Sequence, residues 1–236
     1  MFLFDMMRKR IFLLMCCLHC IFLSKAIAQK NYPDAGSWNT FNVEYGINSH
    51  FSGLFTEEYR VKENFSRLNL FYTNIGVEYK VNKYFKAALV YRFIDKYQDD
   101  NSFSFRHRIM LDLTLKKKLG KFGLSYRQRL QAEKKDIYTS KRGYLTEWYS
   151  RNKLQAKYDL DKPYAPYVSV ELRYQIHDLR NMESERTWHR ARYVVGVDYE
   201  LNHKSTFGIY YLIQKEWSVL SPQDQYIVGL EYTISF

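Results

Sequence analysis

Three observations predict an all-β fold, an up-and-down antiparallel β-barrel. Hydrophobic and polar residues alternate with a period of two over most of the chain. The alternating segments are long, and short and long connections alternate between them. Aromatic residues make up 18% of the 236 residues, with 22 Tyr and 16 Phe, and they gather on the apolar face. With only 4 Pro and 10 Gly, this composition excludes a collagen-like or disordered chain.

The N-terminal segment has the pattern of a secretory signal peptide. Basic residues at 8–10 precede an apolar run at 11–23, and Ala26-Ile27-Ala28 supplies a small-residue cleavage site. The apolar run of 13 residues is too short to cross a bilayer as a helix. We therefore expect cleavage after residues 1–28 and a single mature domain at 29–236. An uncleaved anchor or a buried N-terminal helix is the alternative.

Cysteine content and charge limit the chemistry of the mature chain. The 3 cysteines all lie at 16–20, inside the predicted signal, so the mature chain has no disulfide and no thiolate metal site. It keeps 32 Lys and Arg against 24 Asp and Glu. A net positive charge of this size is compatible with binding to nucleic acid or to anionic lipid. The positions of the basic residues decide between these two classes of partner.

Eleven segments carry the period of two, and each is predicted to be a strand. In the last of them Val228, Leu230 and Tyr232 alternate with smaller or polar residues. Most segments reach the roughly 9 to 11 residues of a membrane strand and exceed the about five to six of a soluble one. The segments are 38–47, 51–62, 67–81, 84–95, 102–117, 121–134, 144–159, 165–177, 187–201, 204–217 and 224–236.

The connections and the last strand predict a bacterial outer-membrane barrel. Short turns on one side and longer loops on the other are typical of that class. The terminal residues Leu230, Tyr232 and Phe236 resemble the signal read by the outer-membrane assembly machinery. Short turns fall near 48–50, 82–83, 118–120, 161–163 and 202–203, and longer loops near 96–101, 135–143, 178–186 and 218–223.

The number of strands is predicted to be ten. Single-chain bacterial barrels have an even number, whereas the alternation marks eleven segments. If the short turns are periplasmic, the segment 38–47 would begin on the outer side. We therefore expect that this segment does not cross, with a missed crossing and twelve strands as the alternative.

Short motifs along the mature chain resemble a known family. They are Trp38, Tyr91-Arg92, Arg106-His107-Arg108, the segments 126–130 and 166–171, His189-Arg190-Ala191-Arg192, Tyr210-Tyr211 and the segment 232–236. Their order over about 200 residues resembles the uncharacterised outer-membrane barrels of the domain of unknown function DUF2490. At 105 the family more often has an acid, where this chain has Phe105. The resemblance implies a barrel in the outer membrane and implies no activity.

The polar face of the strands is predicted to line the barrel interior, because Arg or Lys facing lipid at the bilayer midplane costs about 2 to 4 kcal/mol. In segment 187–201 the alternation puts Trp188 inside with the arginines and His189 outside. The lumen-lining candidates are Arg92, Arg106, Arg108, Arg127, Arg129, Glu147, Arg151, Glu171, Arg173, Arg190 and Arg192.

Two hypotheses fit such an interior. Guanidinium and carboxylate groups pair across strands and fill it, which gives a structural barrel or a narrow channel. Alternatively, the arginines line a path for a small anionic solute. A turn centred near 119–120 would bring Arg108 level with the segment 129–131. The arginines would then crowd together, with Glu147 and Glu171 as the counter-charges.

Other functions find less support in the sequence. A lipid hydrolase needs a Ser–His pair at the outer rim, but His50-Phe51-Ser52 lies at a predicted periplasmic turn, so we expect no catalytic residues. The mature histidines lack metal-ligand spacing, and we expect no metal and no cofactor. Bases that alternate inside a barrel form no accessible nucleic-acid patch.

The expected partners are membrane components. The basic loop 133–142, with Lys134, Lys135, Lys141 and Arg142, is predicted to be solvated and to meet lipopolysaccharide phosphates. The other expected partners are outer-membrane lipids and the assembly machinery. If the barrel acts only through interactions, loops 96–101, 135–143 and 178–186 are its contact surface.

Overall fold

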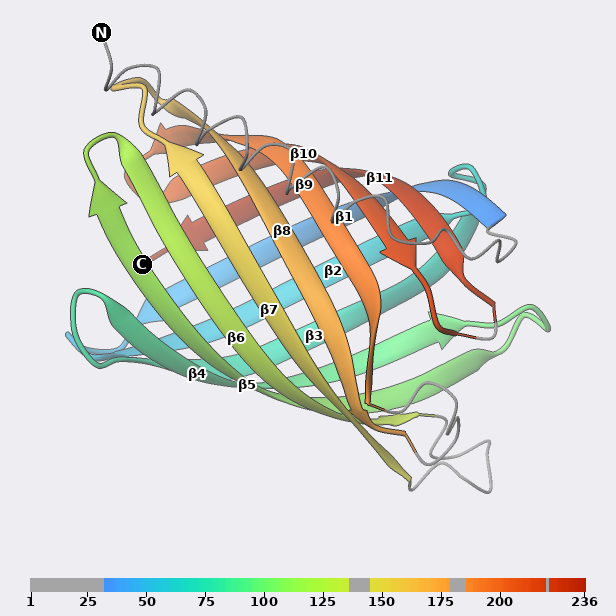
Figure 1. Ribbon diagram of the computed structural model, residues 1–236. Helices are drawn as coiled ribbons and strands as arrows, with labels where there is room; N and C mark the ends of the chain where they lie inside the picture. The colour runs from blue at the N-terminus through green and yellow to red at the C-terminus, as the bar shows by residue number, and fades with distance from the viewer. Residues whose placement is uncertain (1–31, 136–144, 179–185, 220) are drawn as a thin grey trace, which may run out of the picture. The chain divides into compact units, whose positions relative to one another are not determined.

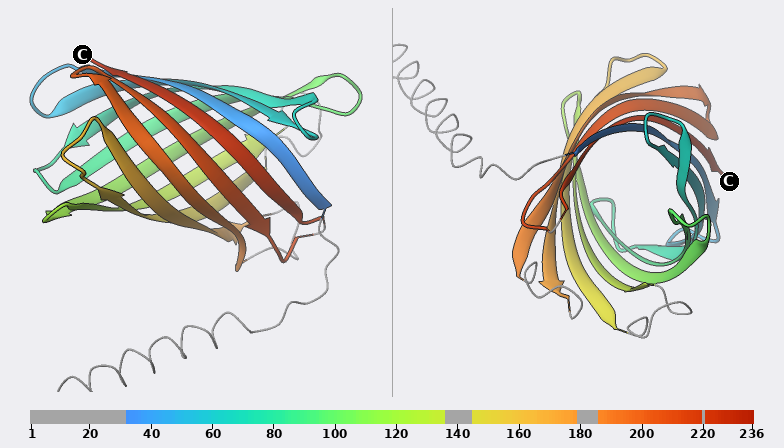
Figure 2. Two further views of the ribbon diagram at one scale, coloured as in Figure 1. Left: turned by 90° about the horizontal axis from the view of Figure 1, so that it is seen from above. Right: turned by 90° about the vertical axis from the view of Figure 1, so that its right-hand side faces the viewer.

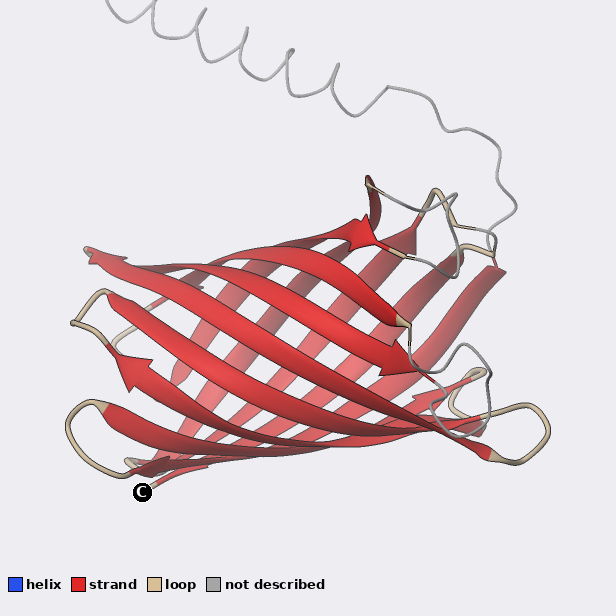
Figure 3. Ribbon diagram, turned by 90° about the horizontal axis from the view of Figure 1, so that it is seen from below, coloured by secondary structure: helices blue, strands red, loops and turns tan. Residues whose placement is uncertain are grey.

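The computed structural model describes residues 32–135, 145–178, 186–219 and 221–236. The predicted signal peptide and its cleavage site lie outside the described residues. Within these ranges the chain forms strands and no helix (Figures 1 and 3), so none of the described segments is a helix able to cross a membrane. The strands are β1 (Tyr32–Gly46), β2 (Phe51–Lys62), β3 (Arg67–Lys80), β4 (Phe85–Tyr97), β5 (Phe103–Leu119), β6 (Phe122–Lys135), β7 (Thr146–Tyr158), β8 (Tyr164–His177), β9 (Thr187–Asn202), β10 (Ser205–Glu216) and β11 (Gln223–Ser235).

The strands close into a barrel in sequence order, which confirms the predicted all-β barrel (Figure 2). Neighbouring strands are antiparallel, except that β1 runs parallel to β11, with Tyr32 opposite Gln223 and Glu44 opposite Ser235. The expectation of ten strands, or of twelve, is wrong, because the described residues form eleven. An odd number makes the first and last strands run the same way, and slanted parallel hydrogen bonds then close the ring.

The first strand is longer than the predicted segment 38–47. It begins at Tyr32, so Pro33 lies inside it. Proline lacks a backbone N–H, and a strand tolerates it near its start, where little of the ladder is lost. β1 is therefore a full strand of the barrel, between β2 and β11, and the expectation that the segment 38–47 is not one of the barrel strands is wrong.

Short turns join the strands at one end of the barrel, at 47–50, 81–84, 120–121, 159–163 and 203–204. The C-terminus lies at this end, where the Gly46 N–H donates to the Phe236 carbonyl at 2.9 Å. We call it the short-turn end. The opposite, long-loop end carries the connections 63–66, 98–102, 136–145, 178–186 and 217–222 and the start of β1, and parts of these loops lie outside the described residues.

Alternation gives the barrel an apolar outer face. Exposed aliphatic side chains lie in the middle of the strands together with Tyr91, Tyr193 and Tyr211, and further aromatic side chains lie toward both ends. Exposed aliphatic residues are Ile75, Leu89, Ile109, Leu130, Leu154, Val168, Val195 and Ile209. Exposed aromatic residues are Tyr45, Phe51, Tyr79, Tyr164 and Tyr199 toward the short turns, and Phe71, Phe103, Trp148 and Trp188 toward the long loops.

Two small apolar clusters lie on the inner face. Trp38, Leu212 and Ile227 form one cluster, and Met110 with its neighbours on β4 forms the other. Most remaining inward side chains are charged or amide-bearing, and many are nearly inaccessible, as at Gln131, Glu133 and Glu147. The interior is therefore held together chiefly by polar contacts.

A β-bulge at the start of β9 reverses two predicted orientations. Arg173 lies opposite Arg190 and Tyr174 lies opposite Trp188, so His189 is the extra residue. A bulge places two successive residues against one on the partner strand and shifts the alternation. Trp188, predicted to face inward, is 43% exposed on the outer face, and His189, predicted to face outward, is 2% exposed.

The β5–β6 pairing differs by a few residues from the predicted one. The turn consists of Gly120 and Lys121, and Gly120 adopts a left-handed φ of 60° that favours glycine. Arg108 therefore lies opposite Glu133, not level with the segment 129–131. A small shift of the turn centre therefore places Arg108 beside an acid, where the predicted pairing placed it close to another arginine.

Part of the basic loop predicted at 133–142 belongs to a strand. β6 continues to Lys135, so Lys134 and Lys135 pair with the neighbouring strands. Lys135 also bonds Glu147. Lys141 and Arg142 lie outside the described residues.

Candidate functional site: ion clusters inside the barrel

Four arginines lie directly opposite one another on neighbouring strands, with an acid at each end of the row. Cβ atoms of directly opposed residues are about 4.5 to 5.5 Å apart, so like charges there repel unless they are compensated. The residues of this arginine row, in order from β5 to β10, are Asp112, Arg129, Arg151, Arg173, Arg190 and Glu216.

The terminal arginines of the row are neutralised by its acids. Arg129 donates from Nε to Asp112 Oδ1 and from Nη2 to Asp112 Oδ2, both at 2.6 Å. At the other end Arg190 forms an ion pair with Glu216. Two-point contact between a planar guanidinium and a carboxylate is the strong form of this interaction. The two inner members, Arg151 and Arg173, have no acid within the row itself.

Glu171 of β8 is the centre of the largest ion cluster. Arg151 Nη2 donates to it at 2.5 Å and Arg127 Nη2 at 2.8 Å, and Arg192 Nη1 lies 3.4 Å away. These bases come from β6, β7 and β9, and the Glu171 side chain is only 8% exposed. One carboxylate serves three guanidinium groups, so the cluster keeps a net positive charge.

Two carboxylates near the long-loop end hold further bases. Arg108 donates to Glu133 Oε2 from Nε at 3.0 Å and from Nη2 at 2.7 Å. Arg106 Nη1 lies 3.9 Å from the same carboxylate. Glu147 binds Lys135. Opposite charges thus link the strands on this side of the barrel as well.

Several inward cations have no carboxylate within ion-pair distance in the described part of the chain, among them Arg92, Arg173 and Lys153. Arg92 donates from Nε to Asn74 Oδ1 at 2.7 Å and lies over the Tyr72 ring. Arg173 donates from Nε to His189 Nε2 at 2.7 Å. Lys153 lies opposite the cation Arg127 on one side and opposite Glu171 on the other, and it forms no ion pair with Glu171. These cations make the interior positive overall.

All eleven lumen-lining candidates have side chains on the inner face, and the pairing brings most of them into the clusters described above. The prediction missed Glu58, Glu133 and Glu216 as counter-charges. Alternation was the available signal at Glu133, which lies in the predicted segment 121–134 and shares a face with Arg127 and Arg129. Glu58 likewise shares a face with Arg60.

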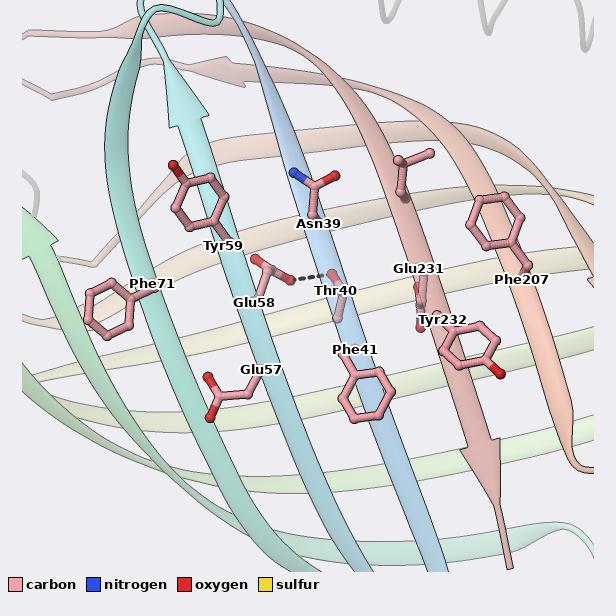
Figure 4. A pocket seen from close by; sticks show the side chains of 11 residues that line it. Asn39, Thr40, Phe41, Glu57, Glu58, Tyr59, Phe71, Phe207, Glu231 and Tyr232 are labelled. Atoms are coloured by element: carbon pink, nitrogen blue, oxygen red, sulfur yellow. Dashed lines mark hydrogen bonds between the residues drawn. The ribbon is translucent and has the colours of Figure 1, made fainter.

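The outer face carries one feature that alternation did not predict. A hollow of about 400 Å³ lies over β1, walled by Phe41, Tyr59, Phe71, Phe207 and Tyr232 (Figure 4). Glu57 lines it and accepts a hydrogen bond from Thr73 Oγ1 at 2.6 Å. The neighbouring residue Glu58 alternates to the inner face, where Thr40 donates to it at 2.9 Å.

Two of the predicted assembly residues, Leu230 and Tyr232, lie on the outer face of β11, and the exposed Phe236 directly follows this strand. Leu230 is 38% exposed, and Tyr232 stacks on Phe41 with ring centroids 6.0 Å apart. The Phe236 N–H donates to the Glu44 carbonyl at 2.9 Å, which ties the chain end to β1. Their role in assembly stays a prediction.

His50 and His107 lie outside the interior, as does His203 in an exposed turn. His50 Nδ1 is 2.9 Å from Ser49 Oγ at an exposed turn, and His107 contacts the Tyr91 hydroxyl on the outer face. Neither contacts a carboxylate among the described residues. In the same ranges, no group of three or more His, Cys, Asp or Glu side chains is placed to hold a metal ion.

These features define a closed β-barrel with an apolar, aromatic outer face and ion clusters on its inner face. The chain belongs to the family described as "Protein of unknown function (DUF2490)", whose model matches residues 35–221, and this confirms the resemblance seen in the sequence. The chain is also similar to a solved porin ("NanC porin structure in rhombohedral crystal form"), with 12% identity, a TM-score of 0.47, and coverage of 76% of this chain and 86% of that one. A search of curated proteins returned no match.

Proposed function

We propose that this chain is a β-barrel of the bacterial outer membrane. The observation that carries the proposal is the division of side chains between the two faces, with aliphatic and aromatic residues outside and arginines inside. Outer-membrane barrels have such an apolar band with aromatic girdles. The strands have 12 to 17 residues, more than the roughly 9 to 11 that a tilted crossing needs.

The proposal includes an orientation. Residues 1–28 direct export, the short-turn end with Phe236 faces the periplasm, and the long loops face outward toward lipopolysaccharide. In this orientation β1 begins on the outer side, because it runs parallel to β11.

The interior supports a barrel that is structural or narrowly conducting, for a solute not yet known. The three guanidinium groups on Glu171 and the pair Arg129–Asp112 join strands β5 to β9 and occupy interior volume. Such bracing suits a narrow interior better than a wide aqueous pore. We do not assign an enzymatic role, since His50 and His107 lack an acid partner among the described residues.

A small anion-selective pore is the second candidate function. The cations Arg92, Lys153 and Arg173 are left without carboxylate partners in the described ranges, and rings of basic side chains select anions in pores. The two candidates differ in whether the interior is open to ions.

Fractionation and conductance test these proposals. The mature protein should sediment with outer membranes after carbonate washing, and its gel mobility should change on boiling. Recovery in the soluble periplasm would refute the membrane assignment. Conductance of the refolded protein in planar bilayers, with a reversal potential in a salt gradient, distinguishes a closed barrel from an anion pore.

A further inference from the structure

We propose that Arg173 is the centre of a binding site for a small oxyanion, a carboxylate or phosphate group, on the inner face of the barrel. This inference rests on the proposed anion passage and names the residue that holds the anion. Arg173 is the member of the arginine row that has no carboxylate partner within the described residues.

The other three arginines of the row each contact an acid. Arg129 pairs with Asp112, Arg151 with Glu171, and Arg190 with Glu216. Arg173 lies between Arg151 and Arg190, directly opposite both. Its own charge is uncompensated and is flanked by two more guanidinium groups, so an anion there lowers the repulsion within the row.

The contacts of Arg173 orient its guanidinium without neutralising it. Nε donates to His189 Nε2 at 2.7 Å, and the guanidinium carbon lies 4.7 Å from the centroid of the Tyr149 ring. The accepting nitrogen of His189 must carry its lone pair, so the ring is neutral with its proton on Nδ1. A carboxylate in this place would have cancelled the positive charge, whereas the neutral imidazole leaves it available.

The free part of Arg173 matches a two-oxygen anion. Neither terminal nitrogen has a hydrogen bond within the described part of the chain. The two terminal nitrogens form a planar fork that suits two oxygens of a carboxylate or phosphate. A halide ion has only one acceptor atom and cannot offer a separate acceptor to each arm of the fork.

The β-bulge in β9 is the structural reason that His189 can act as a positioning residue. Regular alternation would point His189 outward, and the bulge turns it inward beside Arg190. Bulges commonly re-aim a side chain next to a functional site. His189 acts through Arg173 and does not need to touch the anion.

Phosphate titration of the refolded full barrel tests the site, with inorganic phosphate as the probe and calorimetry as the readout. Arg173→Gln should weaken phosphate binding about tenfold or more, because charge-assisted hydrogen bonds are lost. Lys157→Gln removes the same charge from the inner face of β7, near the short turns, where Lys157 pairs with Asp198. It should change the affinity less than about twofold. His189→Leu should weaken binding, and His189→Gln, which keeps an acceptor, should restore part of it.

The outcomes separate the site from the channel. If wild type binds phosphate and Arg173→Gln does not, the site stands even when neither conducts, and only the channel proposal fails. If wild type conducts anions but binds no phosphate, or if Arg173→Gln binds it as wild type does, the site is overturned and the channel stands. Should Arg173→Gln fail to refold, Arg173→Lys keeps the charge but loses the fork. Undiminished phosphate affinity in Arg173→Lys would then overturn the site.

Discussion

Arg129 and Asp112 face each other across β6 and β5 and meet through two hydrogen bonds of 2.6 Å. The pair closes one end of a row of four arginines. It is nearly enclosed, since the side chains are 10% and 11% exposed. Its contribution to stability therefore depends on leaving neither charge alone.

Asp112→Asn should destabilise the refolded barrel by about 3 to 5 kcal/mol, because it leaves a buried guanidinium without its counter-charge. Urea unfolding followed by loss of heat-modifiable mobility measures the change. The double variant Asp112→Asn with Arg129→Gln should recover much of the loss. A single variant within about 0.5 kcal/mol of wild type would show that water already compensates Arg129.

Glu171→Gln should either destabilise the barrel or open an anion conductance, because three arginines lose their shared carboxylate. Glu200→Gln is a matched control, since Glu200 is exposed near a short turn and has no ion pair in the described ranges. Unfolding in urea and bilayer conductance are the two measurements. If both variants behave as wild type, the cluster has no role in bracing or closing the interior.

Gly229→Ala should destabilise the barrel by about 1 to 3 kcal/mol through overpacking. A Cβ at this position would lie 1.9 Å from Cζ of Tyr210, whereas a Cβ at Gly123 would meet its nearest neighbour at 3.8 Å. Gly123→Ala is therefore the control and should leave the free energy of unfolding nearly unchanged. Adding Tyr210→Leu to Gly229→Ala should relieve the loss, and the absence of any relief would show that another contact is responsible.

Leu230→Arg should impair insertion into lipid vesicles, with a cost of about 2 to 4 kcal/mol if the residue lies near the bilayer midplane. Leu230 lies on the outer face in the middle of β11. Glu231→Gln on the inner face should be mild, since Gln keeps an acceptor for the Asn42 amide that donates at 2.7 Å. The folded fraction after refolding is the readout. Equal yields of Leu230→Arg and wild type would mean that lipid does not cover this face.

The ion pairs of Arg127 and Arg129 decide what reversal of their charges should do. If Arg127 and Arg129 lined an open pore, changing both to Glu would invert its selectivity and leave assembly intact. Arg129 instead pairs with Asp112, and Arg127 with Glu171. The double change to Glu would therefore place acids beside acids and should prevent folding. Low folded yield, measured by gel mobility, is the expected result.

The period of two determined much of the fold from the sequence. It predicted the bounds of β2 at 51–62 and the inward orientation of Arg129 and Glu171. Alternation is a local property, because each side chain's face depends only on its neighbours along the strand. For the same reason, the all-β class and the placement of charged side chains on the inner face could be predicted without knowing which strands pair.

The tertiary structure alone decided the pairing and its exceptions. The parallel contact of β1 with β11 joins residues from opposite ends of the chain, so alternation could not reveal that eleven strands close the ring. The bulge at His189 and the turn at Gly120 shift register by one or a few residues, and such shifts depend on hydrogen bonds to a partner strand. They decided that Arg108 meets Glu133 and that Arg173 meets a neutral histidine, because side-chain partners across strands follow from register and not from sequence order.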